Sequence, residues 1–260
     1  MRKIIRTTSG CLMKDYESCY NLRFPPLMPI IVRIDGNSFH TWTKRTGLKK
    51  PFDERLTNLM AETTKHLCEN ISDCVFGYTQ SDEISLLISH LRSPFTESWF
   101  GRRLEKIVSI SASIASYYFN VNNPFDVKLP AYFDARAFVL PESEVKRYFI
   151  WRQKDAVKNS LFSLARSFYS HEKLVGANRE VLHELCFEKG QNWSHLPTKQ
   201  KRGVGVYKRE CLVTTGQKPT YRKQLFIDYD IPTFTNVEDF FDILLKNNAI
   251  AIDNEEVVYK

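Results

Sequence analysis

Three carboxylates, Asp35, Asp82 and Glu83, stand at the ends of short apolar segments in the first third of the sequence. Neighbouring acids repel one another unless a cation lies between them. Mg²⁺ takes one or two carboxylates together with substrate phosphates, and two ions about 3.5–4 Å apart are the usual device for displacement at phosphorus. We therefore predict a site for two Mg²⁺ ions, with Asp35, Asp82 and the Gly36 carbonyl as ligands and Glu83 as a secondary ligand. The alternative is that each acid is a solvated strand end.

Strands and turns predicted around these acids would bring them together. A β-branched apolar run leads to Asp35, as in a buried strand, and Gly36 is expected to end that strand. The polar stretch 80–83 predicts a four-residue hairpin connection. In the segment 132–140, polar and apolar side chains alternate, as in a half-buried strand. The predicted strands cover 29–35, 75–79, 84–88 and 132–140.

Amphipathic helices are predicted between the strands, over about 17 residues after the N-cap Asp53 and over 100–118. The resulting order, β-α-β-β-α-β, is typical of the ferredoxin-like arrangement. Right-handed crossovers place its first and third strands side by side, so Asp35 would meet Asp82 and Glu83 at one edge. The predicted fold class is α+β, a ferredoxin-like domain with its helices on one sheet face.

The remaining residues predict a helical and β-hairpin extension. Apolar spacing indicates a long basic helix over 143–170, and a shorter one follows over 179–187. Two strands, 206–215 and 220–230, would form a hairpin, with Asp228 and Asp230 interpreted as surface acids. The division is a catalytic domain over 1–141 and an extension over 142–260 that packs on it and whose basic helix is suited to an RNA backbone.

Composition favours a polyanionic partner. The net charge is +7 and the pI is about 9.0. The six cysteines form no C-x-x-C pair, which predicts free thiols in a reducing compartment. No apolar stretch is long enough for a signal peptide or a membrane span. We expect a cytoplasmic protein without a membrane partner.

Several motifs, taken in order, resemble those of the tRNA-His guanylyltransferase family, whose members add nucleotides to the 5′ end of tRNA in the 3′-to-5′ direction. The resemblance extends over roughly residues 14–210. Its motifs are Val32–Gly36 with Phe39 and His40, Lys50-Pro51, Gly77–Glu83, Trp99-Phe100 with Arg102, Arg103 and Lys106, Phe133–Arg136, Trp151–Gln153 with Asp155, and Lys201–Gly203.

The resemblance implies a palm-like domain, Mg²⁺ ligands at Asp35, Gly36 and Asp82, activation of the tRNA 5′ end with ATP or GTP, and a homotetramer. Nucleotide-binding residues are predicted from its motifs and from the basic pair at i, i+3 that begins the second helix. They are Asp35, Gly36, Asn37, Ser38, Phe39, His40, Lys50, Ser81, Asp82, Arg103 and Lys106. Predicted RNA contacts are Arg152, Lys158, Asn159, Lys201 and Arg202.

One segment departs from the family pattern. Enzymes that act on tRNA-His carry His-Ile-Asn-Asn-Leu-Tyr-Asn, whereas residues 157–163 read Val-Lys-Asn-Ser-Leu-Phe-Ser. This departure is similar to the guanylyltransferase-like branch, which repairs 5′-truncated tRNA by templated addition. The alternatives are single-G addition to tRNA-His, a non-catalytic RNA-binding module of ferredoxin-like fold, and a nucleotide cyclase on a related palm.

Overall fold

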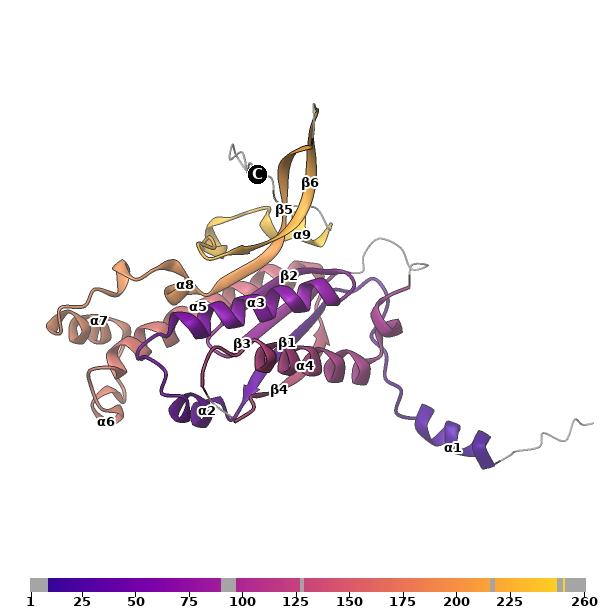
Figure 1. Cartoon of the computed structure of the whole chain (residues 1–260), viewed down its shortest axis with the longest axis horizontal. Helices are drawn as coiled ribbons and strands as arrows, with labels where there is room; N and C mark the ends of the chain where they lie inside the picture. Colours follow the sequence, from indigo (N-terminus) through magenta and orange to yellow (C-terminus); the bar gives the residue numbers. More distant parts are fainter. Residues whose placement is uncertain (1–8, 90–96, 127–128, 216–217, 247–249, 251–260) are drawn as a thin grey trace, which may run out of the picture.

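A six-stranded antiparallel sheet forms the centre of the molecule, in the order β4-β1-β3-β2-β5-β6 (Figure 1). The computed structural model describes residues 9–89, 97–126, 129–215, 218–246 and 250. The first and third strands are neighbours, which confirms the predicted ferredoxin-like order. The strands are β1 (Ile30–Asn37), β2 (Cys74–Gln80), β3 (Glu83–Ile88), β4 (Tyr132–Val139), β5 (Val204–Thr215) and β6 (Lys218–Asp228).

Two helices, α3 (Glu54–Asn70) and α4 (Leu104–Val121), cover one face of the sheet. The predicted apolar stripe of α3 is buried, with Leu67 fully inaccessible. Asp53 caps α3 by accepting a hydrogen bond from the Arg55 amide at 3.0 Å. The Arg55 side chain also binds this carboxylate and lowers the pKa of Asp53 to about 2.

The opposite face is covered by α5 (Glu142–Arg166) and α9 (Phe240–Leu245), around an aromatic core that includes Phe76, Phe149 and Phe234. The long basic helix is therefore confirmed, although it ends before the predicted residue 170. The C-terminal half of α5 packs with α6 (His171–Leu174) and α7 (Arg179–Glu188) in a separate apolar cluster.

The C-terminal hairpin continues the central sheet, because β5 pairs with β2. Asp228 corrects our sequence interpretation: it is 6% exposed and accepts hydrogen bonds from Tyr207 at 2.6 Å and Arg209 at 3.1 Å. Asp230 lies beyond the end of β6. The division of the chain at residue 142 stays a prediction.

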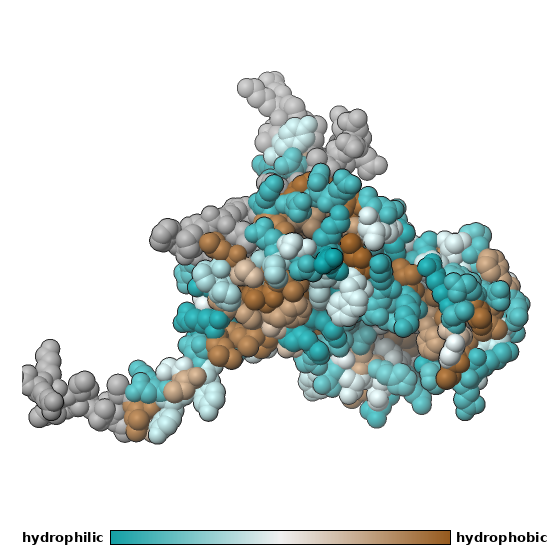
Figure 2. Space-filling view, turned by 180° about the vertical axis from the view of Figure 1, so that it is seen from behind, coloured by the Kyte–Doolittle hydropathy of each residue, from teal (hydrophilic) through white to brown (hydrophobic). Residues whose placement is uncertain are grey.

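The shorter elements are α1 (Ser9–Ser18), α2 (Phe39–Arg45), α8 (Thr198–Arg202) and the 3-10 turns η1 (Trp99–Arg102), η2 (Trp193–His195) and η3 (Phe234–Asn236). Helix α1 stands away from the body, with apolar residues among its polar ones (Figures 1 and 2). Among the described helices, none combines the length and apolar character needed to cross a bilayer.

Candidate active site

The predicted acids meet at one end of the sheet. Asp35 on β1 lies directly opposite Glu83 on β3, and the Gly36 amide donates a hydrogen bond to the Asp82 carbonyl at 3.1 Å. The connection between β2 and β3 is shorter than predicted, because residues 80 and 83 pair and only Ser81 and Asp82 remain in the turn. Ser81 adopts a left-handed conformation with φ of 56°.

Gly36 does not end β1, contrary to the sequence prediction. The strand continues to Asn37 through pairing with β4 alone. A side chain at Gly36 would place its Cβ 2.3 Å from the ring of Phe39. This ring is 3% exposed and packs between Trp42 and Phe133. Glycine is therefore required so that the chain can turn into α2 with Phe39 in the core.

Asp35 and Asp82 are poorly neutralised. Asp35 has a distant ion pair with Arg33 at 3.7 Å, and Asp82 accepts a hydrogen bond from the Ser81 hydroxyl at 2.9 Å. Burial raises the pKa of Asp82, and the charge of Asp35 raises it further. Among the described residues, no group of three or more acidic, histidine or cysteine side chains is arranged to hold a metal. Asp35 and Asp82 form the carboxylate pair on which a cation could be held.

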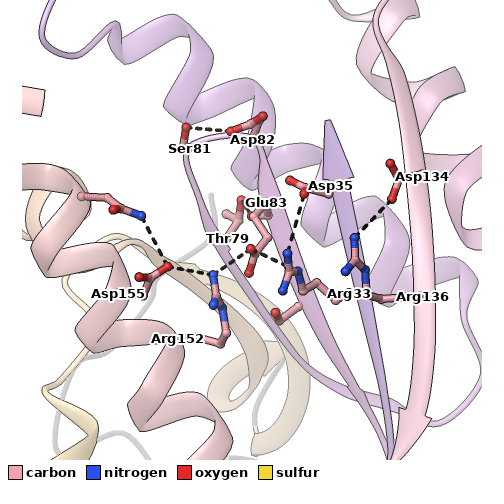
Figure 3. Close-up of polar contacts among 12 residues, drawn as sticks. Arg33, Asp35, Thr79, Ser81, Asp82, Glu83, Asp134, Arg136, Arg152 and Asp155 are labelled. Carbon is pink, nitrogen blue, oxygen red and sulfur yellow. Dashed lines mark hydrogen bonds and ion pairs between the residues drawn. The ribbon is translucent and has the colours of Figure 1, made fainter. Parts of the chain in front are cut away.

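Glu83 differs from these two acids because two arginines bind it. Arg152 on α5 donates a hydrogen bond to its carboxylate at 2.7 Å, and Arg33 lies 3.2 Å away (Figure 3). Arg152 also contacts Asp155 at 3.2 Å. Burial nevertheless raises the pKa of Glu83, against the lowering effect of the two guanidinium groups. This geometry suits Glu83 to fixing the position of the arginines.

Two adjoining cavities open beside the acids. One, of about 300 Å³, is lined by Asp35, Asp82 and Glu83, together with Asp155 and Asn159 of α5. The other, of about 430 Å³, has a basic wall. Its lysines are Lys44, Lys49, Lys50 and Lys199. The two cavities share three wall residues, Gln80, Ser81 and Ser163.

Five of the eleven predicted nucleotide-binding residues line these cavities, and Asp35 and Asp82 are two of them. His40, Lys50 and Ser81 line the larger one, while the buried Phe39 can offer only its backbone. Arg103 and Lys106 are separated from them. They lie at the start of α4, whose other end carries Phe119 against Phe39.

The length of α4 quantifies this separation. Lys106 and Phe119 are 13 residues apart, or about 20 Å at the helical rise of about 1.5 Å per residue. Arg103 instead forms a β-bridge with Arg23. Within one chain, the predicted clamp of Arg103 and Lys106 is therefore not formed at the acids.

The predicted RNA contacts also separate into different environments. Arg152 is 8% exposed and paired with acids, so the structure places it in the active site rather than on an exposed basic face. Asn159 lines the smaller cavity, and Lys158 is exposed. Lys201 donates a hydrogen bond to the Ser194 carbonyl at 2.7 Å. Arg202 is half-buried and donates to the Ile231 carbonyl at 3.3 Å.

Sequence reasoning missed Arg33 and Arg136 as parts of this site. Residues opposite each other on neighbouring strands share a face of the sheet. Arg33 pairs in register with Arg136, and Asp35 pairs with Asp134. A row of arginines therefore lies directly beside a row of carboxylates (Figure 3). The alternation of charged and apolar residues along the first and fourth strands was a signal in the sequence, but only the pairing register of the two strands shows that these charged residues lie side by side.

The comparisons with known proteins agree with this architecture. Residues 11–141 match the family model described as tRNAHis guanylyltransferase. The chain is similar to the tRNA(His) guanylyltransferase of Schizosaccharomyces pombe, at 32% identity over 74% of this chain and 77% of the relative.

Two solved structures are also similar. A bacterial tRNAHis guanylyltransferase-like protein in complex with ATP superposes with a TM-score of 0.82, at 40% identity over 92% of this chain and 99% of the other. A bacterial protein of the same description in complex with GTP gives a TM-score of 0.75, at 38% identity over 91% and 98% of the two chains.

Proposed function

The chain belongs to the tRNAHis guanylyltransferase family and is a nucleotidyltransferase, and from this premise we propose that it adds nucleotides to the 5′ end of tRNA in the 3′-to-5′ direction. We further propose that it repairs 5′-truncated tRNA by templated addition. The observation that carries this proposal is the juxtaposition of Asp35 and Asp82 beside a cavity with a lysine-rich wall.

The carboxylate pair fits Mg²⁺. Among the described residues, the nearest cationic partner of either acid is Arg33, 3.7 Å from Asp35, and the repulsion between Asp35 and Asp82 is the condition that a divalent cation relieves. Two carboxylates completed by substrate phosphates are a usual Mg²⁺ environment. Bound there, Mg²⁺ would favour ionisation of the attacking hydroxyl and neutralise the phosphates. Asp35 and Asp82 would hold it, with the Gly36 carbonyl as the third predicted ligand.

The larger cavity suits a nucleoside triphosphate. Its lysines supply positive charge, and Leu48, Leu56 and Met60 supply an apolar wall for a base. The chain passes from the end of β1 through Ser38 into α2 directly after Asp35, so the backbone amides of residues 37–40 are placed to donate hydrogen bonds to phosphate oxygens. The bacterial relatives solved with ATP and with GTP support this use of the site.

Two displacements at phosphorus complete the proposed reaction. First, the 5′-monophosphate of the tRNA attacks the α-phosphorus of ATP or GTP, and pyrophosphate leaves. Then the 3′-hydroxyl of the incoming nucleotide attacks the activated 5′ phosphorus; its proton is lost and the nucleoside monophosphate leaves. Arg33 and Arg136 are positioned to bind the phosphate charge that develops next to Asp35. The Nε of Arg33 is buried and lies 3.2 Å from the Glu83 carboxylate, which holds the guanidinium in place.

The choice of repair over single-G addition rests on the segment 157–163. Two of its departing residues, Phe162 and Ser163, line the smaller cavity beside Asn159, which keeps the family residue, so part of the departure from the tRNA-His pattern faces the site of chemistry. Identities of 38–40% to the bacterial guanylyltransferase-like proteins also support this branch. Single-G addition remains the competing function because the family is described by that activity.

A primer-extension experiment tests the proposal. The protein would be incubated with ATP, GTP, Mg²⁺ and either a tRNA-His lacking its extra 5′ residue or 5′-truncated tRNAs of other identities. We expect Watson–Crick-directed addition to all truncated tRNAs. Addition confined to G on tRNA-His would contradict the repair function.

Loss of either acid should abolish addition. We expect Asp35→Asn and Asp82→Asn each to lower the rate by about a hundredfold or more without unfolding the protein. Each substitution removes a negatively charged ligand of the Mg²⁺ that assists displacement at phosphorus. Glu69→Gln is a matched control, since Glu69 is exposed on α3 and, among the residues that the structure describes, forms an ion pair with Lys65 alone, at 4.0 Å. Wild-type rates from both aspartate variants would refute the assigned roles.

The family resemblance also suggests how the protein assembles, and the sequence suggests where it acts. We propose a homotetramer that acts in the cytoplasm. Sedimentation at several protein concentrations tests the first, and a species at the mass of a single chain throughout would contradict it. Fractionation of cells with an antibody against the chain tests the second.

A further inference from the structure

Trp151 on α5 is an exposed indole beside the active site that the proposed reaction does not use. Its residue surface is 52% exposed. Two other tryptophans donate their indole N–H to a hydrogen bond, Trp42 to the Leu129 carbonyl and Trp193 to the Ser160 hydroxyl. Within the described part of the chain, Trp151 has no such partner. An indole that is half exposed and retains a free donor has the features of a stacking surface for a planar ligand.

The ring is held on one side by a residue of the active site. The guanidinium carbon of Arg152 lies 4.5 Å from the centre of the Trp151 ring, and Tyr148 contacts the ring at 5.8 Å between centroids. Arg152 is in turn fixed by its 2.7 Å hydrogen bond to Glu83. The indole is therefore oriented by the same contacts that order the acids, and about half of its surface remains exposed to a ligand.

The surroundings of Trp151 favour a polyanionic ligand. Arg147 precedes it, and Lys154 and Lys158 follow it, at helical spacing on one side of α5, and all three are exposed. Arg147 shares its charge with Glu144 at 3.1 Å. Lys154 and Lys158 make no ion pair among the described residues. A basic stripe interrupted by an aromatic ring is the pattern that binds single-stranded nucleic acid through phosphate contacts and base stacking.

The position of Trp151 separates it from the nucleotide pocket. It lines neither cavity. It lies one helical turn, about 6 Å along the axis, before Asp155, which lines the smaller cavity. A base on this ring would thus be adjacent to the reacting 5′ phosphate but outside the triphosphate pocket.

We propose that Trp151 is a stacking site for a nucleobase at the end of the RNA substrate, and that it positions that end relative to Asp35. The inference rests on the proposed function for the identity of the polymer. The base belongs either to the 5′-terminal residue or to the facing residue of the 3′ strand, since both present the same planar surface.

A binding experiment without added nucleotide tests this site. The probe is an acceptor-stem RNA hairpin with a truncated 5′ end and a fluorophore in its loop, followed by anisotropy at fixed salt. We expect Trp151→Leu to raise the Kd about tenfold, which corresponds to one aromatic stacking contact. Trp151→Phe should raise it less than threefold, because it retains an aromatic face. Tyr117→Ala, an exposed aromatic on α4 across the sheet, should leave the Kd unchanged.

RNA with an abasic residue identifies the stacked base. An abasic residue at the stacked position should weaken wild-type binding and remove the difference between wild type and Trp151→Leu. Abasic substitution of the 5′-terminal residue in one probe, and of the facing 3′-strand residue in another, distinguishes the two sources. A Trp151→Leu effect that persists undiminished with both probes would refute stacking.

Further outcomes separate this inference from the proposed function. Three results for Trp151→Leu would each overturn the inference. They are an unchanged Kd for RNA, a weaker affinity for ATP alone with RNA binding intact, and an altered assembly by sedimentation at constant RNA affinity. Nucleotide addition by wild type together with such a result would leave the proposed function standing. RNA binding that depends on Trp151 in a protein that adds no nucleotide would refute only the proposed function.

Discussion

Arg152 offers a quantitative test of the arrangement around the acids. Arg152→Met removes its charge while retaining most of its apolar stem, so the packing of α5 is largely preserved. The substitution leaves Glu83, whose side chain is 16% exposed, without its 2.7 Å partner. It also removes the 3.2 Å contact to Asp155.

The expected magnitude follows from burial and from the partner that remains. Removing one member of a buried ion pair costs about 3–5 kcal/mol because an uncompensated charge is left behind. Arg33 still lies 3.2 Å from Glu83 and compensates part of that charge. We therefore expect Arg152→Met to lower the free energy of unfolding by about 3 kcal/mol, at the lower end of that range.

Glu83→Gln should cost less. Arg33 and Arg152 then retain Asp35 and Asp155 as partners, both more exposed than Glu83. We expect about 2 kcal/mol for this variant. The double variant should lose about 3 kcal/mol rather than the sum of about 5 kcal/mol, because removing both charges leaves neither of them without its partner. The coupling energy between Arg152 and Glu83 is then about 2 kcal/mol.

Urea unfolding followed by circular dichroism measures all four proteins of this cycle. Arg147→Met on the same helix is the matched control, because its pair with Glu144 is exposed and is expected to contribute less than about 1 kcal/mol. Additive losses, or a loss below about 1 kcal/mol from Arg152→Met, would show that the Glu83 pair does not hold this part of the molecule together.

Two further substitutions probe the elements that support the site. Asp53→Asn keeps a capping side chain but loses the charge bound by Arg55. Folding lowers the pKa of Asp53 from 3.8 to about 2, so its charge should add about 2 kcal/mol to the free energy of unfolding above pH 4, and this contribution should disappear as the pH falls toward 2. Urea unfolding of both proteins across this pH range measures the difference. A pH-independent difference would contradict that origin. Gly36→Ala should destabilise the protein by about 3 kcal/mol or more because its Cβ meets the Phe39 ring at 2.3 Å, whereas Gly176→Ala meets no atom within 4 Å and should cost only about 1–2 kcal/mol from its positive φ. Equal thermal shifts for the two glycine variants would refute this explanation.

Local pattern was sufficient for most of the fold. The apolar run before Asp35 and the stripe of α3 carry the period of their own secondary structure, so β1 and α3 could be predicted without any tertiary contact. Topological rules then placed the first and third strands side by side. Because both constraints depend on residues close in the sequence or on chain connectivity, they also predicted that Asp35 and Asp82 approach each other.

The exact ends of these elements were less predictable. Gly36 remains in β1 because β4 pairs with it, and the turn between β2 and β3 is short because residues 80 and 83 pair. Both outcomes depend on hydrogen bonds to another strand. The position of Arg103 and Lys106 could have been derived from topology. Strand β3 begins with Glu83 at the acidic end of the sheet, and α4 begins near the other end of β3 and runs back along the sheet.

By itself, then, the sequence determined the order of the strands, the amphipathic faces of the helices and the pair of acids at one sheet end. Tertiary structure alone decided which charges those acids meet. Arg152 reaches Glu83 across 69 positions of sequence, and Arg33 becomes its second partner only through the register of β1 with β3. Packing of α5 also buries Arg152 while leaving Trp151 open, because one helical step turns neighbouring side chains in different directions.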